Sequence, residues 1–148
     1  MGLLDGKVAI VTGAGSVRGQ GAAAARLFVA EGARAVVLAD LPSTDAAGVA
    51  REIGEAASFV ALDVTDAQAW DAAVAHVASE FGTVDVLVNN AGVWLDTGLA
   101  ETTPEQYRRV VEINQTGVFL GMRAVVPVMR KAGKGAIVNT SSTSGLKG

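Results

Sequence analysis

Short apolar runs recur along the chain, and the segments between them are long enough to form helices. Each run is almost entirely apolar over four or five residues and is followed directly by a polar residue. A strand with one face in water would alternate apolar and polar positions, whereas a continuous apolar run is typical of a strand buried on both faces. The pattern predicts five buried strands, at residues 7–11, 35–39, 59–62, 84–88 and 136–139.

The segments between these runs carry helix signals. The first is alanine-rich and ends before Gly32, and glycine commonly ends helices. Thr65 followed by Gln68, and Thr103 followed by Gln106, are capping-box patterns, in which a hydroxyl and an amide satisfy backbone groups at the start of a helix. The signals predict four helices, at residues 21–31, 46–57, 65–82 and 103–131.

Strands that alternate with helices predict an α/β fold with a doubly wound parallel sheet. No linker, repeat or block of charge divides the chain, so we expect a single domain over residues 1–148. In an open sheet of this kind the carboxyl ends of the strands share one edge, and ligands bind there. The polar residues that follow the strands are therefore the first candidates for a functional role.

The composition narrows the class of protein. Of the 148 residues, 50% are hydrophobic and 18% are charged, as is typical of a globular domain. The formal net charge of −3 offers no basic surface for nucleic acid or for an anionic membrane, so we expect neither as a partner. The chain has no cysteine, no secretory signal pattern and no apolar run of the ~18 residues that a membrane span needs, so we expect a cytoplasmic protein.

A glycine-rich stretch joins the first predicted strand to the first predicted helix. It contains Gly13, Gly15, Gly19 and Gly21, and glycines there let backbone N–H groups approach a pyrophosphate at the helix N-terminus. Asp40 follows the next strand, where a carboxylate accepts hydrogen bonds from ribose hydroxyls and repels a 2′-phosphate. The alternative is a tight turn and a solvated carboxylate, but the placement between strand and helix favours a dinucleotide site. We therefore expect NAD as the cofactor, in preference to NADP.

Polar residues also follow the other three strands. Asp63 follows the third, where it either caps the next helix or touches the adenine end of a nucleotide, and the sequence leaves both open. Residues 89–92 follow the fourth; their two amides could tie strands together beside a ligand, although this stretch alone favours an ordinary Asn/Gly turn. Ser141 and Ser142 follow the fifth. We expect all of these residues to face the same edge of the sheet as Asp40.

Asn114 is an amide in an otherwise apolar stripe of the long predicted helix. Such an amide either bonds to backbone as a structural group or points into an active site, and the pattern alone favours the structural role. Gly117 and Gly121, near the same face, permit close packing. We expect Tyr107 to pack in this stripe and His76 to lie on the surface. No pattern of metal ligands is present, and we expect no metal site.

Together these motifs resemble the short-chain dehydrogenase/reductase family, and the likeness covers essentially the whole chain. Thr12-Gly13 with Gly19 and Gly21 resembles the cofactor loop of the family, and Asp40 resembles the acid that accompanies NAD. Asp63-Val64 resembles its adenine-side pair, and Asn89-Asn90-Ala91-Gly92 its NNAG signature. The resemblance implies catalytic roles for Asn114 and for Ser142, which precedes Gly145, and it implies cofactor binding by Gly13, Gly15, Ser16, Arg18, Gly19, Gly21, Asp40, Asp63, Val64, Asn90, Ala91 and Gly92.

The resemblance implies a Rossmann-like sheet with strand order 3-2-1-4-5, truncated before the last strands of the family. It also implies an NAD-dependent oxidoreductase that moves a hydride between the cofactor and a small-molecule alcohol or carbonyl substrate. In the family a serine holds the substrate oxygen, and the tyrosine and lysine of a YxxxK motif carry out the acid/base chemistry. The chain is expected to form a homo-oligomer through the long helix that starts near Thr103.

The tyrosine–lysine pair is absent from this chain, whose one tyrosine is Tyr107. We therefore expect the chain to be the cofactor-binding part of a longer enzyme. The alternatives are a non-catalytic dinucleotide-binding protein, such as a truncated regulatory paralogue, and a remnant that binds nothing. The loop after Gly92, including Trp94 and Leu95, is expected to contribute to substrate specificity.

The glycine-rich stretch departs from the family pattern in two ways. Five residues, 14–18, separate Gly13 from Gly19, which is more than the family usually has, so the phosphate contacts are not fixed by the resemblance. Arg18 directly precedes Gly19, where a basic residue accompanies NADP in some members. Asp40 still favours NAD, because its charge repels a 2′-phosphate.

Overall fold

The computed structural model describes residues 2–143 and contains one five-stranded parallel sheet with strand order β3-β2-β1-β4-β5. The strands are β1 (Val8–Thr12), β2 (Ala35–Asp40), β3 (Ala57–Ala61), β4 (Val86–Asn89) and β5 (Ala136–Asn139). The helices are α1 (Gln20–Ala30), α2 (Ala46–Ile53), α3 (Ala67–Phe81), α4 (Pro104–Val111), the π-helical segment η1 (Glu112–Thr116) and α5 (Gly117–Ala132). The predicted fold class and strand order are confirmed.

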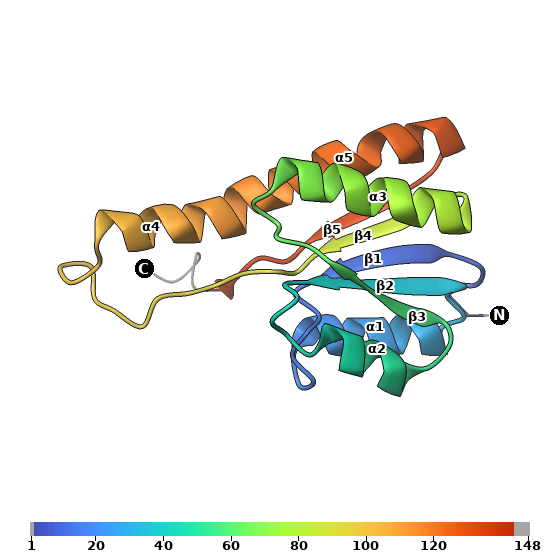
Figure 1. Cartoon of the computed structure of the whole chain (residues 1–148), viewed down its shortest axis with the longest axis horizontal. Coiled ribbons are helices and arrows are strands. Elements are labelled where there is room, and N and C mark those ends of the chain that lie inside the picture. The colour runs from blue at the N-terminus through green and yellow to red at the C-terminus, as the bar shows by residue number, and fades with distance from the viewer. Residues whose placement is uncertain (1, 144–148) are drawn as a thin grey trace.

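Helices cover both faces of the sheet, with α1 and α2 on one face and α3 and α5 on the other (Figure 1). Successive residues of β1 point to opposite faces. Val8 and Ile10 belong to the core beneath α3 and α5, whereas Ala9 and Val11 belong to the core beneath α1 and α2. All four are at most 1% exposed, and this two-sided burial explains why the strand is apolar at every position.

Side-chain caps start two of the helices. The carboxylate of Asp66 accepts hydrogen bonds from two backbone N–H groups in the first turn of α3, so Asp66 is the cap. The capping-box pattern had predicted Thr65 at this position, and this prediction is wrong. Thr103 caps α4 as predicted. Its hydroxyl accepts the N–H of Gln106 at 3.2 Å, and the side-chain oxygen of Gln106 accepts the N–H of Thr103 at 2.8 Å.

The second helix is shorter than predicted, because α2 ends at Ile53 and not at residue 57. Gly54 has a φ of 114°, a conformation that ends the helix and that other residues rarely adopt. β3 then begins at Ala57, two residues earlier than predicted, and Ala57 pairs with Val36 of β2. Pairing along the edge of the sheet therefore outweighs the helix preference of the alanines in this stretch.

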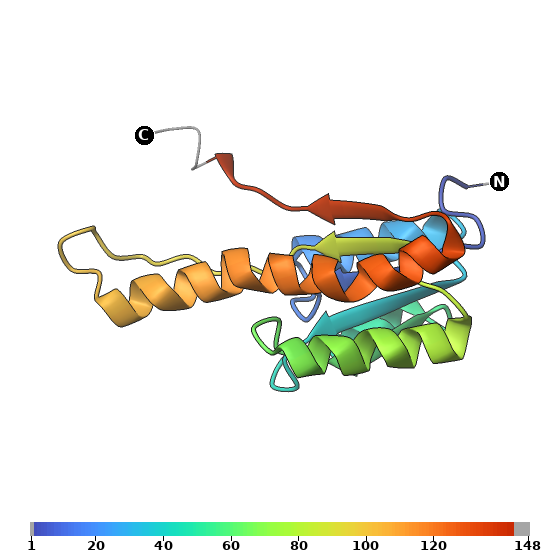
Figure 2. The same cartoon turned by 90° about the horizontal axis from the view of Figure 1, so that it is seen from above.

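The long predicted helix is continuous but contains a π-helical turn, η1, that the sequence did not predict. Such a turn holds an extra residue, so the side chains before and after it do not follow one helix face. Tyr107 was expected to pack, and this is wrong: it is 64% exposed, and α4 has no buried residue. The reason is that α4 projects beyond the end of the sheet, where it has no core to pack against (Figure 2).

In contrast, α5 packs closely against the sheet and α3. Gly117 and Gly121 are buried in it, and a Cβ on Gly121 would lie 2.8 Å from the ring of Trp70, so the predicted role of these glycines in close packing is confirmed. Trp70 of α3 is fully buried, and its indole N–H donates to the carbonyl oxygen of Val64 at 3.0 Å. Since Val64 lies just beyond β3, this hydrogen bond connects the core to the functional edge of the sheet.

We predict that Trp70→Ala lowers the free energy of unfolding by about 3–5 kcal/mol, because it removes a large buried side chain and leaves a cavity. The matched control is Trp94→Ala, since Trp94 is 84% exposed and its loss should change stability by less than about 0.5 kcal/mol. Urea unfolding followed by circular dichroism measures both. Similar effects of the two substitutions would contradict the packing described here.

Candidate functional site

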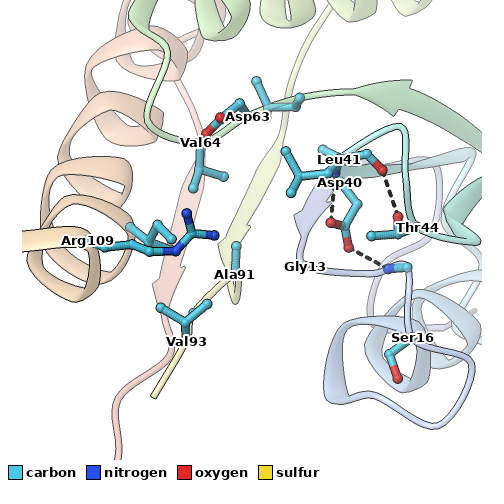
Figure 3. A pocket seen from close by; sticks show the side chains of 15 residues that line it. Gly13, Ser16, Asp40, Leu41, Thr44, Asp63, Val64, Ala91, Val93 and Arg109 are labelled. Carbon is cyan, nitrogen blue, oxygen red and sulfur yellow. Dashed lines mark hydrogen bonds between the residues drawn. The ribbon is translucent and has the colours of Figure 1, made fainter. Parts of the chain in front are cut away.

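The carboxyl ends of the strands meet at one edge of the sheet, and a cavity of about 490 Å³ opens there (Figure 3). The glycine-rich stretch and the ends of β2 and β3 form part of its wall, and the loop after β4 and helix α4 form the rest. The predicted cofactor residues that line this first cavity are Gly13, Gly15, Ser16, Asp40, Asp63, Val64, Ala91 and Gly92. The structure therefore brings together residues from four separate loops, as the sequence predicted.

In the glycine-rich stretch, Gly13 and Gly21 permit a close approach of backbone to the neighbouring loops. Gly13 has a φ of 65°, and a Cβ there would lie 2.7 Å from the Cα of Ala91. A Cβ on Gly21 would lie 2.5 Å from the carbonyl oxygen of Gly13 and 2.8 Å from the amide nitrogen of Asn90. The two glycines thus let α1, the end of β1 and the loop after β4 pack directly on one another.

Asp40 holds a negative charge at the wall of the first cavity. One carboxylate oxygen accepts the N–H of Gly15 at 2.7 Å, and the other accepts the N–H of Leu41 at 2.8 Å (Figure 3). Thr44 donates its hydroxyl to the carbonyl oxygen of Leu41 at 2.8 Å. The carboxylate is therefore fixed in direction, and it connects the end of β2 to the glycine-rich stretch.

Asp63 and Val64 occupy the short loop that follows β3. One carboxylate oxygen of Asp63 accepts the backbone N–H of Thr65 at 2.9 Å and its hydroxyl at 2.7 Å. Asp63 is therefore not the cap of α3, which is Asp66. Of the two roles that the sequence left open, a helix cap is excluded, and the exposed carboxylate lines the first cavity.

Thr12 and Asn90 tie the end of β1 to the end of β4. The hydroxyl of Thr12 donates to the carbonyl oxygen of Val88 and accepts the N–H groups of Asn90 and Ala91, both at 3.0 Å. In return, the side-chain amide of Asn90 donates to the carbonyl oxygens of Thr12 and Gly13 at 3.0 and 3.2 Å. Residues 89–92 are therefore a strand tie and not an ordinary turn.

Asn89 extends the tie to the next strand. Its side chain is buried, and its amide nitrogen donates to the side-chain oxygen of Asn139 at 2.9 Å. It also lies 3.4 Å from the carbonyl oxygen of Val118 on α5. The two adjacent asparagines therefore connect β4 to different neighbours, because Asn90 hydrogen-bonds to the end of β1 and Asn89 hydrogen-bonds to β5.

Asn114 lies in η1 and bonds to the backbone of Val93 in both directions. Its side-chain oxygen accepts the N–H of Val93 at 2.8 Å, and its amide nitrogen donates to the carbonyl oxygen of Val93 at 2.8 Å. The structural role that the pattern favoured for this amide is confirmed. Asn114 also lines a second cavity of about 660 Å³, together with Gln20, Asn90, Ala91, Gly92, Val93, Trp94, Val118, Thr140, Ser141, Ser142 and Thr143.

The two cavities share the wall formed by residues 91–93. The predicted catalytic residues, Asn114 and Ser142, line the second cavity, and so does Asn90, which was predicted to bind the cofactor. Arg18, Gly19 and Gly21 line neither cavity. Gly145 lies outside the described residues.

Among the side chains of the first cavity that sequence reasoning missed are Arg109 and Ile113 of the long helix. They stand four residues apart along the long helix, so one face of that helix contributes to the wall. The spacing was visible in the sequence. What it did not reveal is that α4 extends past the sheet and that η1 changes the direction in which its side chains point.

Two further properties bear on the kind of site. Residues 2–143 contain no group of three His, Asp or Glu side chains placed to hold a metal ion. Among the helices of the described part of the chain, none is long and apolar enough to cross a membrane.

His76 is exposed on α3, as expected for a surface residue, and its Nε2 lies 3.4 Å from a carboxylate oxygen of Glu80.

Known proteins resemble this chain in both sequence and fold. The chain is 46% identical over 147 residues to the 3-alpha-(or 20-beta)-hydroxysteroid dehydrogenase of Mycobacterium tuberculosis, a match that covers 99% of this chain and 55% of that protein. It is 44% identical over 151 residues to the trans-4-hydroxycyclohexanecarboxylate dehydrogenase of Sinomonas cyclohexanicum, with 96% and 57% covered. The chain thus spans little more than half the length of these curated relatives.

A crystal structure described as a short-chain dehydrogenase/reductase from Burkholderia xenovorans has the same fold. The two structures superpose with a TM-score of 0.90 at 40% identity, over 100% of this chain and 61% of that one. The family model for short chain dehydrogenases matches residues 7–148. The chain belongs to the short-chain dehydrogenase/reductase family.

Proposed function

We propose that this chain binds NAD and forms the cofactor-binding part of an oxidoreductase that acts on alcohols or ketones. The observation that carries the proposal is the position of Asp40, which is fixed by two backbone N–H groups at the wall of the first cavity. A carboxylate there accepts hydrogen bonds from ribose hydroxyls. The size of the cavity, about 490 Å³, fits a ligand as large as an adenosine group.

The described residues support a position for each part of the cofactor. Asp63 and Val64, which line the first cavity but not the second, suit the adenine end. The glycine-rich stretch at the start of α1 suits the diphosphate, because the N-terminus of a helix favours negative charge. Residues 91–93 line both cavities, so they suit the middle of an extended dinucleotide. When bound, NAD supplies the hydride acceptor.

The second cavity suits the nicotinamide end and the substrate. Ser142 lines it, which supports a role for this residue in holding the oxygen of a substrate alcohol or carbonyl. Asn114 fixes Val93 and thereby the wall that separates the two cavities. Trp94 lines the second cavity with its exposed ring, so it offers apolar surface to the substrate. Both relatives described above are named for the dehydrogenation of hydroxylated ring compounds, which supports a substrate of that class.

The acid/base step is the part that this chain does not supply. Tyr107 is its one tyrosine, and this residue lies exposed on α4 and lines neither cavity. This observation favours a second candidate function, in which the 148 residues bind the dinucleotide without catalysing its reaction.

We also propose a homo-oligomer through the long helix, since Tyr107 and Phe119 are 64% and 57% exposed along it.

We expect the 148-residue chain to show no appreciable dehydrogenase turnover, although it binds NADH. General acid/base catalysis contributes typically ~10²–10⁴-fold, and among the described residues that line the second cavity no side chain is suited to it. The assay follows NADH absorbance with cyclic and open-chain secondary alcohols, using protein whose mass has been verified. Robust turnover would refute the expectation and would require a different acid/base group.

We predict that the chain binds NADH more tightly than NADPH and that Asp40→Asn reduces this preference on the order of tenfold, because it removes a charge that repels the 2′-phosphate. Asn keeps an oxygen that can accept the N–H of Gly15, so the glycine-rich stretch should keep its position. Fluorescence titration with both reduced cofactors measures the preference. Equal or tighter NADPH binding by the unmutated chain would sink the idea.

We predict that Asn114→Ala speeds amide hydrogen exchange at Val93 roughly 5- to 20-fold, because it removes two hydrogen bonds that hold this residue. NADH binding should weaken as well, since Val93 lines both cavities. Gln115→Ala is the matched control, because Gln115 is the exposed neighbour in the same π turn. Unchanged exchange at Val93 would show that the loop is held by other contacts.

A further inference from the structure

Arg109 is a cationic side chain in the wall of the first cavity, opposite the glycine-rich stretch. It lies on α4, and Figure 3 shows its guanidinium group directed from that helix toward the space between Val64 and Val93. Among the described residues that line this cavity it is the one Lys or Arg, and Asp40 and Asp63 are the carboxylates. No motif of the sequence pointed to it.

The direction of Arg109 is set by the helix that carries it. Ile113 stands one turn further along and lines the same cavity, so this face of the helix looks inward. Arg108, in contrast, pairs with Glu105 at 3.2 Å on the exposed face. In the part of the chain that the structure describes, the guanidinium of Arg109 makes no hydrogen bond and no ion pair.

The carboxylates across the cavity do not need this cation. Asp40 is held by the N–H groups of Gly15 and Leu41, and Asp63 is held by Thr65. An unpaired guanidinium beside satisfied carboxylates suits an anionic ligand, because its N–H donors match the oxygens of a phosphate.

The glycine-rich stretch leaves a need that Arg109 can meet. The N–H of Gly15 would be a natural donor to a diphosphate, but it donates to Asp40, which also places a negative charge nearby. Arg18, the other cation in this region, lines neither cavity. A bound diphosphate therefore has one backbone donor fewer than the stretch contains, and Arg109 is the cation of the cavity wall that can compensate for it.

We propose that Arg109 binds the diphosphate of the dinucleotide from the α4 side, opposite the glycine-rich stretch. The inference rests on the proposed function, since it needs a dinucleotide in the first cavity. Arg109 is thus an affinity-determining residue that sequence motifs do not mark. It holds the anionic part of the ligand, whereas Asp40 reads the ribose.

The test compares ligands with and without phosphate in the 148-residue chain. ADP and adenosine compete with NADH, whose fluorescence reports binding. Arg109→Met should weaken ADP about five- to tenfold and leave adenosine unchanged, because a partly exposed charged hydrogen bond is lost while the base and ribose contacts remain. Arg109→Lys should fall between, since it keeps the charge but not the planar fork. Arg108→Met is the control and should change neither ligand.

Each other outcome overturns the inference. Equal weakening of ADP and adenosine would mean that Arg109 packs on the base or holds α4 in place, and no change would mean that it does not reach the ligand. A change in oligomeric state of Arg109→Met, seen by light scattering, would assign the residue to an interface between copies of the chain. If the unmutated chain binds neither NADH nor ADP, the proposed function falls together with the inference, so the two failures are distinguishable.

Discussion

The hydroxyl of Thr12 joins the central strand β1 to its neighbour β4 at the point where their ladder of hydrogen bonds ends. Backbone groups beyond the end of a strand need partners if they are buried, and here the two loops provide them for each other. The hydroxyl of Thr12 hydrogen-bonds to the backbone of Val88, Asn90 and Ala91. The side-chain amide of Asn90 hydrogen-bonds to the backbone of Thr12 and Gly13. Because residues 91–93 line both cavities, the position of this tie sets the shape of the whole edge.

Asp40 carries the same connection one strand further. Its carboxylate binds the N–H of Gly15, so the end of β2 is attached to the loop that Thr12 and Asn90 hold. A ligand that hydrogen-bonds to Asp40 therefore acts on a group that is already part of the scaffold. The cost of orienting this carboxylate is met during folding, and less conformational entropy remains to be lost when a ligand binds.

The strands were predictable because burial on both faces forces a continuous apolar sequence, as in β1. The shared edge followed from the parallel direction of the strands, so the approach of Asp40 and Asp63 could also be anticipated. Tyr107 and Arg109 could not be placed, because their surroundings depend on how far α4 projects and on the turn at η1. These features arise from long-range packing, to which a local pattern is blind. The end of α2 was missed for the same reason, since pairing of β3 with β2 decided it.

The position of α4 is set at η1, because α5 is held in the core by its buried residues while α4 has no buried residue of its own. A rotation of the helix at η1 therefore moves every side chain of α4. One residue of an α-helix corresponds to a rotation of about 100°, so a chain that lost the extra residue of η1 would keep α5 seated and turn Arg109 and Ile113 away from the first cavity. A single-residue deletion far from the glycine-rich stretch would thus remodel one wall of the cavity, and homologues that differ in length there would differ in ligand preference without any change in their recognisable motifs.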